Sequence, residues 1–482
     1  MIPAQAKLIA AIRGALGPKS VISDPHDIAP WLVDWRGRYH GQSAAILAPA
    51  DTAGVATILR LANAASIPLV PQGGNTSMVG GATPPADGSA LILSLRRMNH
   101  IRRVDPDANL AIAEAGVILA DLQSAVEAAG RRFPLTLGAR GSATIGGLAS
   151  TNAGGTQVLR FGTMRALVAG IEAVLPDGSV HDGLAALKKD NRGYDLNQLL
   201  VGAEGTLGVI TAVTLRLVPS IAARAVAWVG VDSPQAALAL LRRLETATDT
   251  VESFEIVPQI SLGLVLAHIP DTRSPIAGKH PWHVLIEAVS SDAAAEAPSL
   301  LLERLLGSAL SDGLVADAVI AASEAQADAF WRLRDSISEA ERASGPAVQH
   351  DISVPVDAMP DFMTRGAAAV EARFAGTHAS AFGHLGDGNV HFHVRAPTDA
   401  DAKTWYADEA PQITPFVNDL VVAAGGSISA EHGIGQMKLA ELERLSSPAR
   451  MAALRAIKSG LDPHHIMNPG KLVTLAPAPA AP

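Results

Sequence analysis

The feature that most constrains this chain is a glycine-rich stretch at residues 138–155, with the sequence GARGSATIGGLASTNAGG. Six of its eighteen residues are glycine, which has no Cβ and lets a backbone approach a ligand closely. Successive backbone N–H groups in such loops bind anions. A flexible linker is the alternative, but Ile145 and Leu148 place apolar anchors where a linker has none. The stretch therefore predicts a loop that holds a pyrophosphate-bearing ligand such as a dinucleotide.

Composition indicates a globular protein with several domains. The chain has 482 residues, which exceeds one ordinary core, so two or three domains are expected. The net charge of −9 and the lack of any Lys/Arg-rich run argue against nucleic acid as a partner. The absence of cysteine excludes disulfides, cysteine-ligated iron–sulfur clusters and cysteine-linked flavin. Electrons that leave one at a time would therefore need another protein to accept them.

The N-terminal sequence carries no sign of export. Residues 1–16 have the pattern of an amphipathic helix that contains Lys7 and Arg13, and no signal-peptide pattern follows. No run of about 18 apolar residues exists, so no spanning helix is expected. We expect a cytoplasmic protein, with peripheral association at the membrane compatible with this sequence.

The first half of the chain alternates short strands with helices. Two further glycine-rich loops, at 72–81 and 202–211, each lie beside an expected strand, which is the usual setting of a phosphate-binding loop. Three such loops in one block favour a nucleotide-binding domain. The expected strands are 45–47, 67–71, 91–93, 110–116 and 171–175, and the expected helices are 54–65, capped by Asp51, and 120–129.

After Pro219 the pattern changes to strands at 228–231, 251–256 and 282–288 with intervening helices. This order is typical of a second, α+β domain with an antiparallel sheet. One long helix is expected at 324–343, with Arg334 between Trp331 and Ser338 along one stripe. Arg334 is either a clamp for a substrate carboxylate or a solvated surface arginine.

The segment FGHLGDGNVHFHV, residues 382–394, is the sharpest candidate for a reaction centre. If Asp387-Gly388 forms a two-residue hairpin turn, His384 faces His391 across the strands. If the turn slips by one residue, His384 faces His393 instead. In both registers the imidazoles share one face, where they could bind a metal ion or form polar cross-strand pairs.

A carboxylate ligand and a base are available in the segment SISAEHGIG, residues 427–435. Glu431 supplies the carboxylate and His432 another imidazole. The pair could equally form a salt link at the end of a strand. Two imidazoles and one carboxylate leave open coordination positions for substrate oxygens, which is the pattern of a catalytic metal site.

These motifs, together with Asn468-Pro469-Gly470-Lys471, resemble the FAD-linked D-2-hydroxyacid dehydrogenases of the vanillyl-alcohol-oxidase-type flavoprotein superfamily. The resemblance runs from about residue 44 to 472. It implies an α+β fold with a two-part FAD-binding domain and a cap domain. The expected parts are an N-terminal helix and tether at 1–40, the FAD domain at 41–220, the cap at 221–425, a returning segment at 426–474 and a disordered tail at 475–482.

The resemblance also implies which residues hold FAD. The first loop is expected at the pyrophosphate, the second at the pyrophosphate and isoalloxazine, and the third near the adenosine. Because the first loop has Asn75-Thr76 where some relatives have a flavin-linked histidine, the FAD is expected to be non-covalent. The expected contacts are Pro71, Gln72, Gly73, Gly74, Asn75, Thr76, Ser77, Pro134, Gly141, Ser142, Thr144, Gly146, Gly147, Thr151, Asn152, Gly155, Glu204, Gly205, Gly208, Ile210 and Asn468.

For the reaction centre, the resemblance implies that a divalent metal of the Zn²⁺ type is bound by His384, His391 and Glu431, with His432 as the base. The expected substrate contacts are Arg334, Ser338, Gln349 and His393. One departure concerns the substrate. The hydroxyglutarate enzymes tend to have a lysine shortly before the segment that is Asp351-Ile352-Ser353 here, and this chain has Gln349-His350. The missing cation weakens the case for a dicarboxylate, unless His350 or His393 compensates.

The implied reaction is oxidation of a D-2-hydroxyacid, such as D-lactate or D-2-hydroxyglutarate, to the 2-keto acid. Electrons would pass to an electron-transferring flavoprotein or a quinone, and a homodimer is compatible with the sequence. Three alternatives remain at this point. They are a flavin oxidase that uses oxygen, a metallohydrolase acting on a nucleotide-like substrate, and a non-catalytic FAD- or metal-binding regulator.

Overall fold

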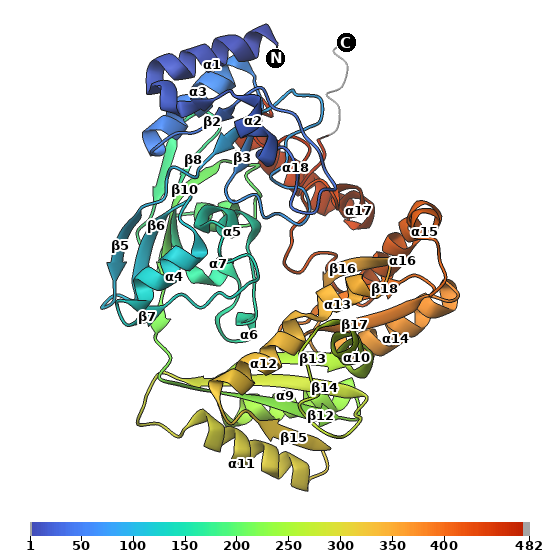
Figure 1. Cartoon of the computed structure of the whole chain (residues 1–482). Coiled ribbons are helices and arrows are strands. Elements are labelled where there is room, and N and C mark those ends of the chain that lie inside the picture. Colours follow the sequence, from blue (N-terminus) through green and yellow to red (C-terminus); the bar gives the residue numbers. More distant parts are fainter. Residues whose placement is uncertain (1, 476–482) are drawn as a thin grey trace. The chain divides into compact units, whose positions relative to one another are not determined.

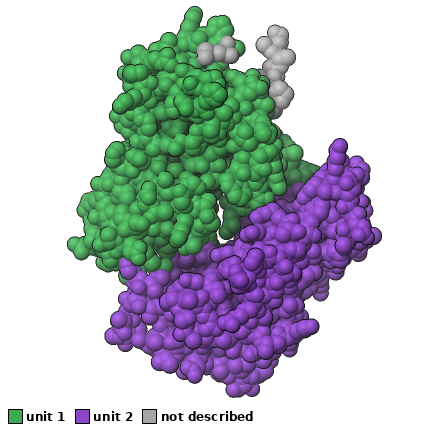
Figure 2. Space-filling view, in the orientation of Figure 1, with its two compact units in different colours: residues 1–155, 162–219, 431–482 green, residues 156–161, 220–430 purple. Residues whose placement is uncertain are grey.

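The computed structural model describes residues 2–475, and the expected tail lies outside them after residue 475. Figure 1 shows the elements in chain order. The chain forms two compact units, coloured separately in Figure 2. Unit 1 contains residues 1–155, 162–219 and 431–482, and unit 2 contains residues 156–161 and 220–430.

Unit 1 contains a four-stranded sheet of order β1-β2-β4-β3, in which β2, β4 and β3 run parallel. Its core is aliphatic and includes Ile58 and Leu59 of α3 against Leu91 and Leu93 of β4. The Asp51 carboxylate caps α3 by accepting a hydrogen bond from the N–H of Gly54, as expected. These elements are α1 (Pro3–Leu16), η1 (Pro18–Ser20), β1 (Val21–Ile22), α2 (Pro25–Ile28), η2 (Ala29–Trp31), β2 (Ile46–Leu47), α3 (Thr52–Ala65), β3 (Leu69–Gln72) and β4 (Leu91–Ser94).

A five-stranded antiparallel sheet of order β5-β6-β10-β8-β9 completes the sheets that form the body of unit 1. Strands β7 and β11 form a separate two-stranded antiparallel sheet. The elements are β5 (Ile101–Asp105), β6 (Leu110–Glu114), α4 (Leu119–Glu127), β7 (Arg131–Arg132), α5 (Ile145–Thr151), α7 (Met164–Leu167), β8 (Val168–Val174), β9 (Val180–Gly183), α8 (Leu196–Leu200), β10 (Val209–Arg216), β11 (Val218–Pro219), α17 (Leu439–Leu445) and α18 (Pro448–Leu461).

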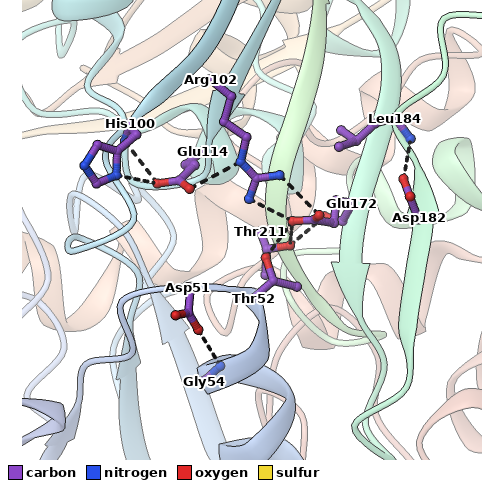
Figure 3. Close-up of polar contacts among 10 residues, drawn as sticks. All are labelled: Asp51, Thr52, Gly54, His100, Arg102, Glu114, Glu172, Asp182, Leu184 and Thr211. Carbon is purple, nitrogen blue, oxygen red and sulfur yellow. Dashed lines mark hydrogen bonds and ion pairs between the residues drawn. The ribbon is translucent and has the colours of Figure 1, made fainter. Parts of the chain in front are cut away.

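A polar cluster around Glu172 connects α3 to the five-stranded sheet (Figure 3). The carboxylate of Glu172 accepts hydrogen bonds from Thr52 at 2.6 Å, from Thr211 at 2.8 Å and from Arg102 at 3.0 Å. Arg102 also bonds Glu114 on the neighbouring strand. The cluster therefore connects the start of α3 to four strands of this sheet, β5, β6, β8 and β10.

The glycine-rich stretch 138–155 is not wholly a loop, because residues 145–151 form helix α5. Ile145, Leu148 and Ala149 are buried on the inner side of this helix. Asn152 ends it in a left-handed conformation, with φ 51°. The apolar anchors noted in the sequence are therefore the buried face of a short helix.

Unit 2 is built on a seven-stranded, entirely antiparallel sheet of order β15-β12-β14-β13-β17-β18-β16, which confirms the expected α+β class. Its elements are α6 (Val158–Phe161), β12 (Ala223–Val231), α9 (Pro234–Ala247), β13 (Val251–Pro258), α10 (Gln259–His268), β14 (Trp282–Ser290), α11 (Pro298–Ser311), β15 (Asp317–Ile320), α12 (Glu324–Asp335), α13 (Ile337–Ala343), β16 (Ala347–Ser353), α14 (Met359–Arg373), β17 (His378–His384), β18 (Asn389–Arg395), α15 (Ala402–Asp408) and α16 (Ala410–Ala423).

The two faces of β17 and β18 differ in chemistry because side chains alternate along a strand. One face presents Ala381, Val390 and Phe392 to a large apolar core that includes residues of α14 and α16. The opposite face carries His384 and His393, both buried. Burying imidazoles costs free energy of folding unless their polar groups are paired. A functional site is therefore expected on this face of the sheet.

The long helix expected at 324–343 is interrupted. Helix α12 ends at Asp335, and α13 begins at Ile337. Between them Ser336 has ψ near −4°, which departs from helical geometry. Ser338 therefore belongs to a different helix from Trp331 and Arg334, and the expected single stripe does not continue across the break.

Candidate active site

The sequence suggested two possible registers for the hairpin β17–β18, and the observed register differs from both. His384 pairs with Asn389, and Phe382 pairs with His391, so the connection is the four residues 385–388. The N–H of Leu385 donates to the carbonyl of Phe254, which draws the end of β17 toward β13. The shared face nevertheless survives, since the rings of His384 and His391 are 5.5 Å apart.

Glu255 of β13 lies directly across from His384 and organises this part of the site. Its Oε1 is 2.6 Å from Nδ1 of His384, and its Oε2 accepts a hydrogen bond from Nε of Arg334 at 2.7 Å. Burial alone would raise the pKa of Glu255, but the positive charges of His384 and Arg334 lower it below the ordinary 4.5. The carboxylate is therefore ionised and fixes the ring of His384 through Nδ1, while Nε2 faces Nη2 of Arg334 at 3.4 Å.

His391 is held in the neutral form. Burial, and then the positive charge of Arg334, lower its pKa well below 6.5. Neutral imidazole is the form that binds metal ions.

His384, His391 and Glu431 come together, with one potential ligand atom from each lying within 4.8 Å of the others. The chain reaches Glu431 from Ser427, whose N–H and carbonyl both bond Ser353 at the end of β16. Two imidazole nitrogens and a carboxylate oxygen suit zinc and several other divalent ions. The donor set of the described residues therefore fits a metal with open coordination positions.

Arg334 is close to this cluster. Its side chain is 10% exposed, and its Nη2 is 3.4 Å from Nε2 of His384. The guanidinium of an arginine has five N–H donors, and only Nε is used by Glu255. Arg334 is thus a buried cation at the site and not a solvated surface arginine.

A second carboxylate–imidazole pair lies two residues along β18. The Nδ1 atom of His393 is in short contact with Oε2 of Glu341 on α13. Glu341 has no exposed surface and also accepts a hydrogen bond from Ser380 at 2.7 Å. His393 is therefore held in one orientation on the same face as His391.

The remaining expected substrate contacts have different positions. Gln349 pairs with His393 across β16 and β18 and is half-buried, and Ser338 is half-buried on α13. His350 points to the opposite face, where its ring nitrogens contact the carbonyl of Phe392 and the hydroxyl of Thr414. The idea that His350 compensates for the missing lysine is therefore wrong.

The first two glycine loops pack directly on each other within unit 1. A Cβ on Gly74 would overlap the carbonyl of Ser142, and one on Gly73 would overlap the hydroxyl of Thr144. Among the described residues, the backbone N–H groups of Gly74, Asn75 and Thr76 have no hydrogen-bond acceptor. The buried hydroxyl of Thr144 is also without a partner there. Such unpaired donors suit the phosphates of a dinucleotide.

Several expected cofactor side chains bond the protein itself. The amide of Gln72 donates to the carbonyls of Trp31 and Ala82, and that of Asn75 donates to Val33. Asn152 accepts from Thr163 and from the backbone of Arg165. These side chains shape the loops, which leaves backbone N–H groups to meet a ligand.

The third loop places Glu204 against the C-terminal segment. Its carboxylate accepts hydrogen bonds from the N–H groups of Ile434 and Gly435, both at 2.7 Å. Burial raises its pKa, and Lys438 and Lys471 oppose that rise. Asn468 donates to the carbonyls of Gly81 and Glu204.

Sequence reasoning did not identify Glu255 or Glu341. Both have no exposed surface, which is rare for a carboxylate. Glu255 had a local signal, since it interrupts the apolar strand 251–258 next to Phe254 and Ile256. Glu341 had none, because an acidic residue in a helix is ordinarily solvated.

Family comparison divides the chain into two parts. Residues 43–183 match the family described as FAD binding domain. Residues 221–472 match the family described as FAD linked oxidases, C-terminal domain.

The curated relatives are similar over nearly the whole chain. D-2-hydroxyglutarate dehydrogenase, mitochondrial, from Arabidopsis thaliana is 36% identical over 97% of this chain and 81% of its own length. The Bos taurus protein of the same name is 37% identical over 95% of this chain and 81% of its own. D-2-hydroxyglutarate dehydrogenase from Xanthomonas citri pv. viticola is 34% identical over 98% of each chain.

Solved structures confirm the fold. p-Cresol methylhydroxylase has a TM-score of 0.74 at 14% identity and covers 98% of this chain and 97% of its own. Alkyldihydroxyacetonephosphate synthase has a TM-score of 0.72 at 15% identity, covering 97% of this chain and 85% of its own. The expected vanillyl-alcohol-oxidase-type fold is thus correct.

The expected cytoplasmic location is contradicted, because the plant and bovine relatives are named as mitochondrial proteins. Across residues 2–475, every helix is too short or too polar to span a membrane.

Proposed function

This chain belongs to the FAD-linked D-2-hydroxyacid dehydrogenases and is an FAD-dependent oxidoreductase, and on that premise we propose a metal-assisted oxidation at the β17–β18 hairpin. The substrate is a D-2-hydroxyacid of the D-lactate or D-2-hydroxyglutarate type, and the product is the 2-keto acid. The observation that carries the proposal is the convergence of His384, His391 and Glu431.

His384, His391 and Glu431 would hold the metal, which supplies Lewis acidity to the 2-hydroxyl and lowers its pKa. By accepting from Nδ1, Glu255 would hold His384 in the tautomer in which Nε2 is the ligand atom. The glycine loops would hold FAD non-covalently, and FAD would supply the acceptor for the hydride from C2.

Arg334 binds the substrate carboxylate through the guanidinium nitrogens that Glu255 does not use. Because Nη2 of Arg334 lies 3.4 Å from Nε2 of His384, a carboxylate bound there lies next to the metal ligands. His432, adjacent to Glu431 in the chain, removes the proton from the 2-hydroxyl. Ser338, Gln349 and His393 line the substrate side chain.

The names of the relatives support D-2-hydroxyglutarate as the first substrate to test. Gln349 in place of a lysine favours an uncharged substrate side chain instead. The electron acceptor is proposed to be a separate flavoprotein or quinone. An oxidase would differ by releasing peroxide during turnover in air.

The proposed role of His432 is tested by His432→Ala in anaerobic single-turnover mixing with the hydroxyacid. Flavin reduction should slow by about 10²- to 10⁴-fold, the usual contribution of a general base, with FAD and metal contents unchanged. The matched control is His268→Ala, which removes an exposed imidazole at the end of α10. Unchanged reduction in His432→Ala would remove this residue from the mechanism.

A further inference from the structure

We propose that Glu204 is a positioning residue for Glu431 and His432, acting by anchoring the turn 433–435 that follows them. The inference rests on the proposed function, because it assigns to that site a residue distant from it in sequence. It gives Glu204 a role different from contact with the adenosine of FAD.

The contact is a two-point anchor. Oε1 of Glu204 accepts from the N–H of Ile434 and Oε2 accepts from the N–H of Gly435, each at 2.7 Å. Two adjacent N–H groups directed at one carboxylate form an anion-binding nest, and here the anion belongs to the chain itself. Glu204 as a whole residue is 8% exposed, so water cannot readily replace its carboxylate.

The turn is shaped to accept this carboxylate. Gly433 and Gly435 have φ values of +82° and +52°, a region that favours glycine. A Cβ on Gly433 would lie 2.7 Å from Oε1 of Glu204, too close for any side chain. Gly433 is therefore adapted to the position of Glu204, whereas a Cβ on Gly435 would overlap the carbonyl of Val79.

Glu204 is itself fixed by the two cofactor loops. It has φ +51°, which is uncommon outside glycine. Its N–H donates to the carbonyl of Ser150 at 2.8 Å, and its carbonyl accepts from the Asn468 amide at 2.7 Å. Asn468 in turn donates to the carbonyl of Gly81 at 3.0 Å. The loops expected to hold FAD and the turn after His432 therefore share one anchor.

The Glu204 carboxylate should therefore affect Glu431 and His432 but not FAD binding. Ile434 is three residues beyond Glu431 and two beyond His432, so releasing the turn frees the backbone that orients both side chains. The backbone N–H groups of the first loop do not depend on the Glu204 carboxylate. Loss of the carboxylate should thus loosen the metal ligand and the base while FAD remains bound.

The test is Glu204→Gln, which keeps the size of the side chain but replaces one acceptor oxygen by an NH₂ group. In the FAD-loaded full chain we expect unchanged flavin content, Zn²⁺ affinity lower by about 10- to 100-fold, and flavin reduction slower by at least about 10-fold. The amides of Ile434 and Gly435 should exchange hydrogen faster. Zn²⁺ affinity, reduction rate and exchange all within twofold of the wild type would overturn the proposal. So would loss of FAD with normal Zn²⁺ affinity.

The matched control is Glu172→Gln, which changes a different hydrogen-bonded carboxylate of unit 1, one that pairs with Arg102 (Figure 3). It should reproduce any general loss of stability without changing Zn²⁺ affinity or the reduction rate. If Glu204→Gln does not fold, Glu204→Asp retracts the carboxylate by one methylene and should show the same pattern, and wild-type values there would contradict the anchor. If no hydroxyacid reduces the wild-type flavin, the proposed function fails, while amide exchange still decides the role of Glu204.

Discussion

Nδ1 of His384 lies 2.6 Å from Oε1 of Glu255, a carboxylate without exposed surface that also binds Arg334. One buried charge therefore orients both the proposed metal ligand His384 and the proposed substrate-binding cation Arg334. This pairing makes the site sensitive to a residue that would touch neither the metal nor the substrate.

Glu255→Gln should lower metal affinity by about 10- to 100-fold, because the amide cannot hold His384 in the required tautomer as the carboxylate does. Competition with a chelator measures this. The control is Glu252→Gln, since Glu252 is another fully buried carboxylate of β13 but pairs with Arg160. Equal metal affinity in the Glu255 and Glu252 variants would show that the contact between Glu255 and His384 does not affect metal binding.

Arg334→Lys should raise KM for the hydroxyacid by about 10-fold or more, since lysine cannot bind Glu255 and a substrate carboxylate in the same geometry. Steady-state kinetics separate KM from kcat, and the flavin spectrum reports retained FAD. Arg332→Lys on the same helix is the control, because Arg332 is exposed and donates to the carbonyl of Pro270. A KM unchanged in Arg334→Lys would exclude the clamp.

Gly74→Ala should abolish or strongly reduce FAD binding, because the added methyl group overlaps the Ser142 carbonyl and forces the first two glycine loops apart. The ratio of flavin to protein absorbance in the purified variant measures this. Gly138→Ala provides the comparison, since nothing lies within 4 Å of its Cβ position. Full flavin content in Gly74→Ala would mean that the contact between the loops is not needed.

Acid stability should depend on Glu172. Burial alone would raise its pKa, but hydrogen bonds from Arg102, Thr52 and Thr211 outweigh it and lower the pKa below 4.5. Its contribution is therefore complete above about pH 4.5 and is lost as the pH falls through the folded-state pKa. Glu172→Gln should lower Tm by about 2–4 °C at pH 7, and the difference should shrink below pH 4.5. A Tm difference between wild type and variant that grows as the pH falls would contradict the direction of this pKa shift.

Much of the fold was readable from the sequence because its signals are local. Asp51 caps α3, as its residue type at the helix start predicted, and the segment 282–288 lies within β14, as its alternation predicted. Expectations failed where distant contacts decide the local structure. The hairpin loop at 385–388 takes its register partly from the bond of Leu385 to Phe254 on another strand.

The sequence identified only part of the candidate site, because the other residues of the site are brought to it by contacts between distant parts of the chain. His384, His391 and Glu431 stand in recognisable motifs, and the structure brings them together. Glu255 is 129 residues from His384, and Glu204 is 230 residues from Ile434. No spacing pattern connects residues so far apart, so the carboxylates that orient the site emerge only from the folded chain.

The central claim is tested most directly by an anaerobic absorbance scan of the FAD-loaded protein with D- and L-2-hydroxyacids, before and after metal removal. The panel contains lactate, 2-hydroxyglutarate, malate, glycolate and 2-hydroxybutyrate. We predict that a D-acid bleaches the flavin band, that its L-enantiomer does not, and that chelation abolishes bleaching until Zn²⁺ is restored. A flavin that no acid of the panel reduces, or that is reduced equally without metal, would contradict the account.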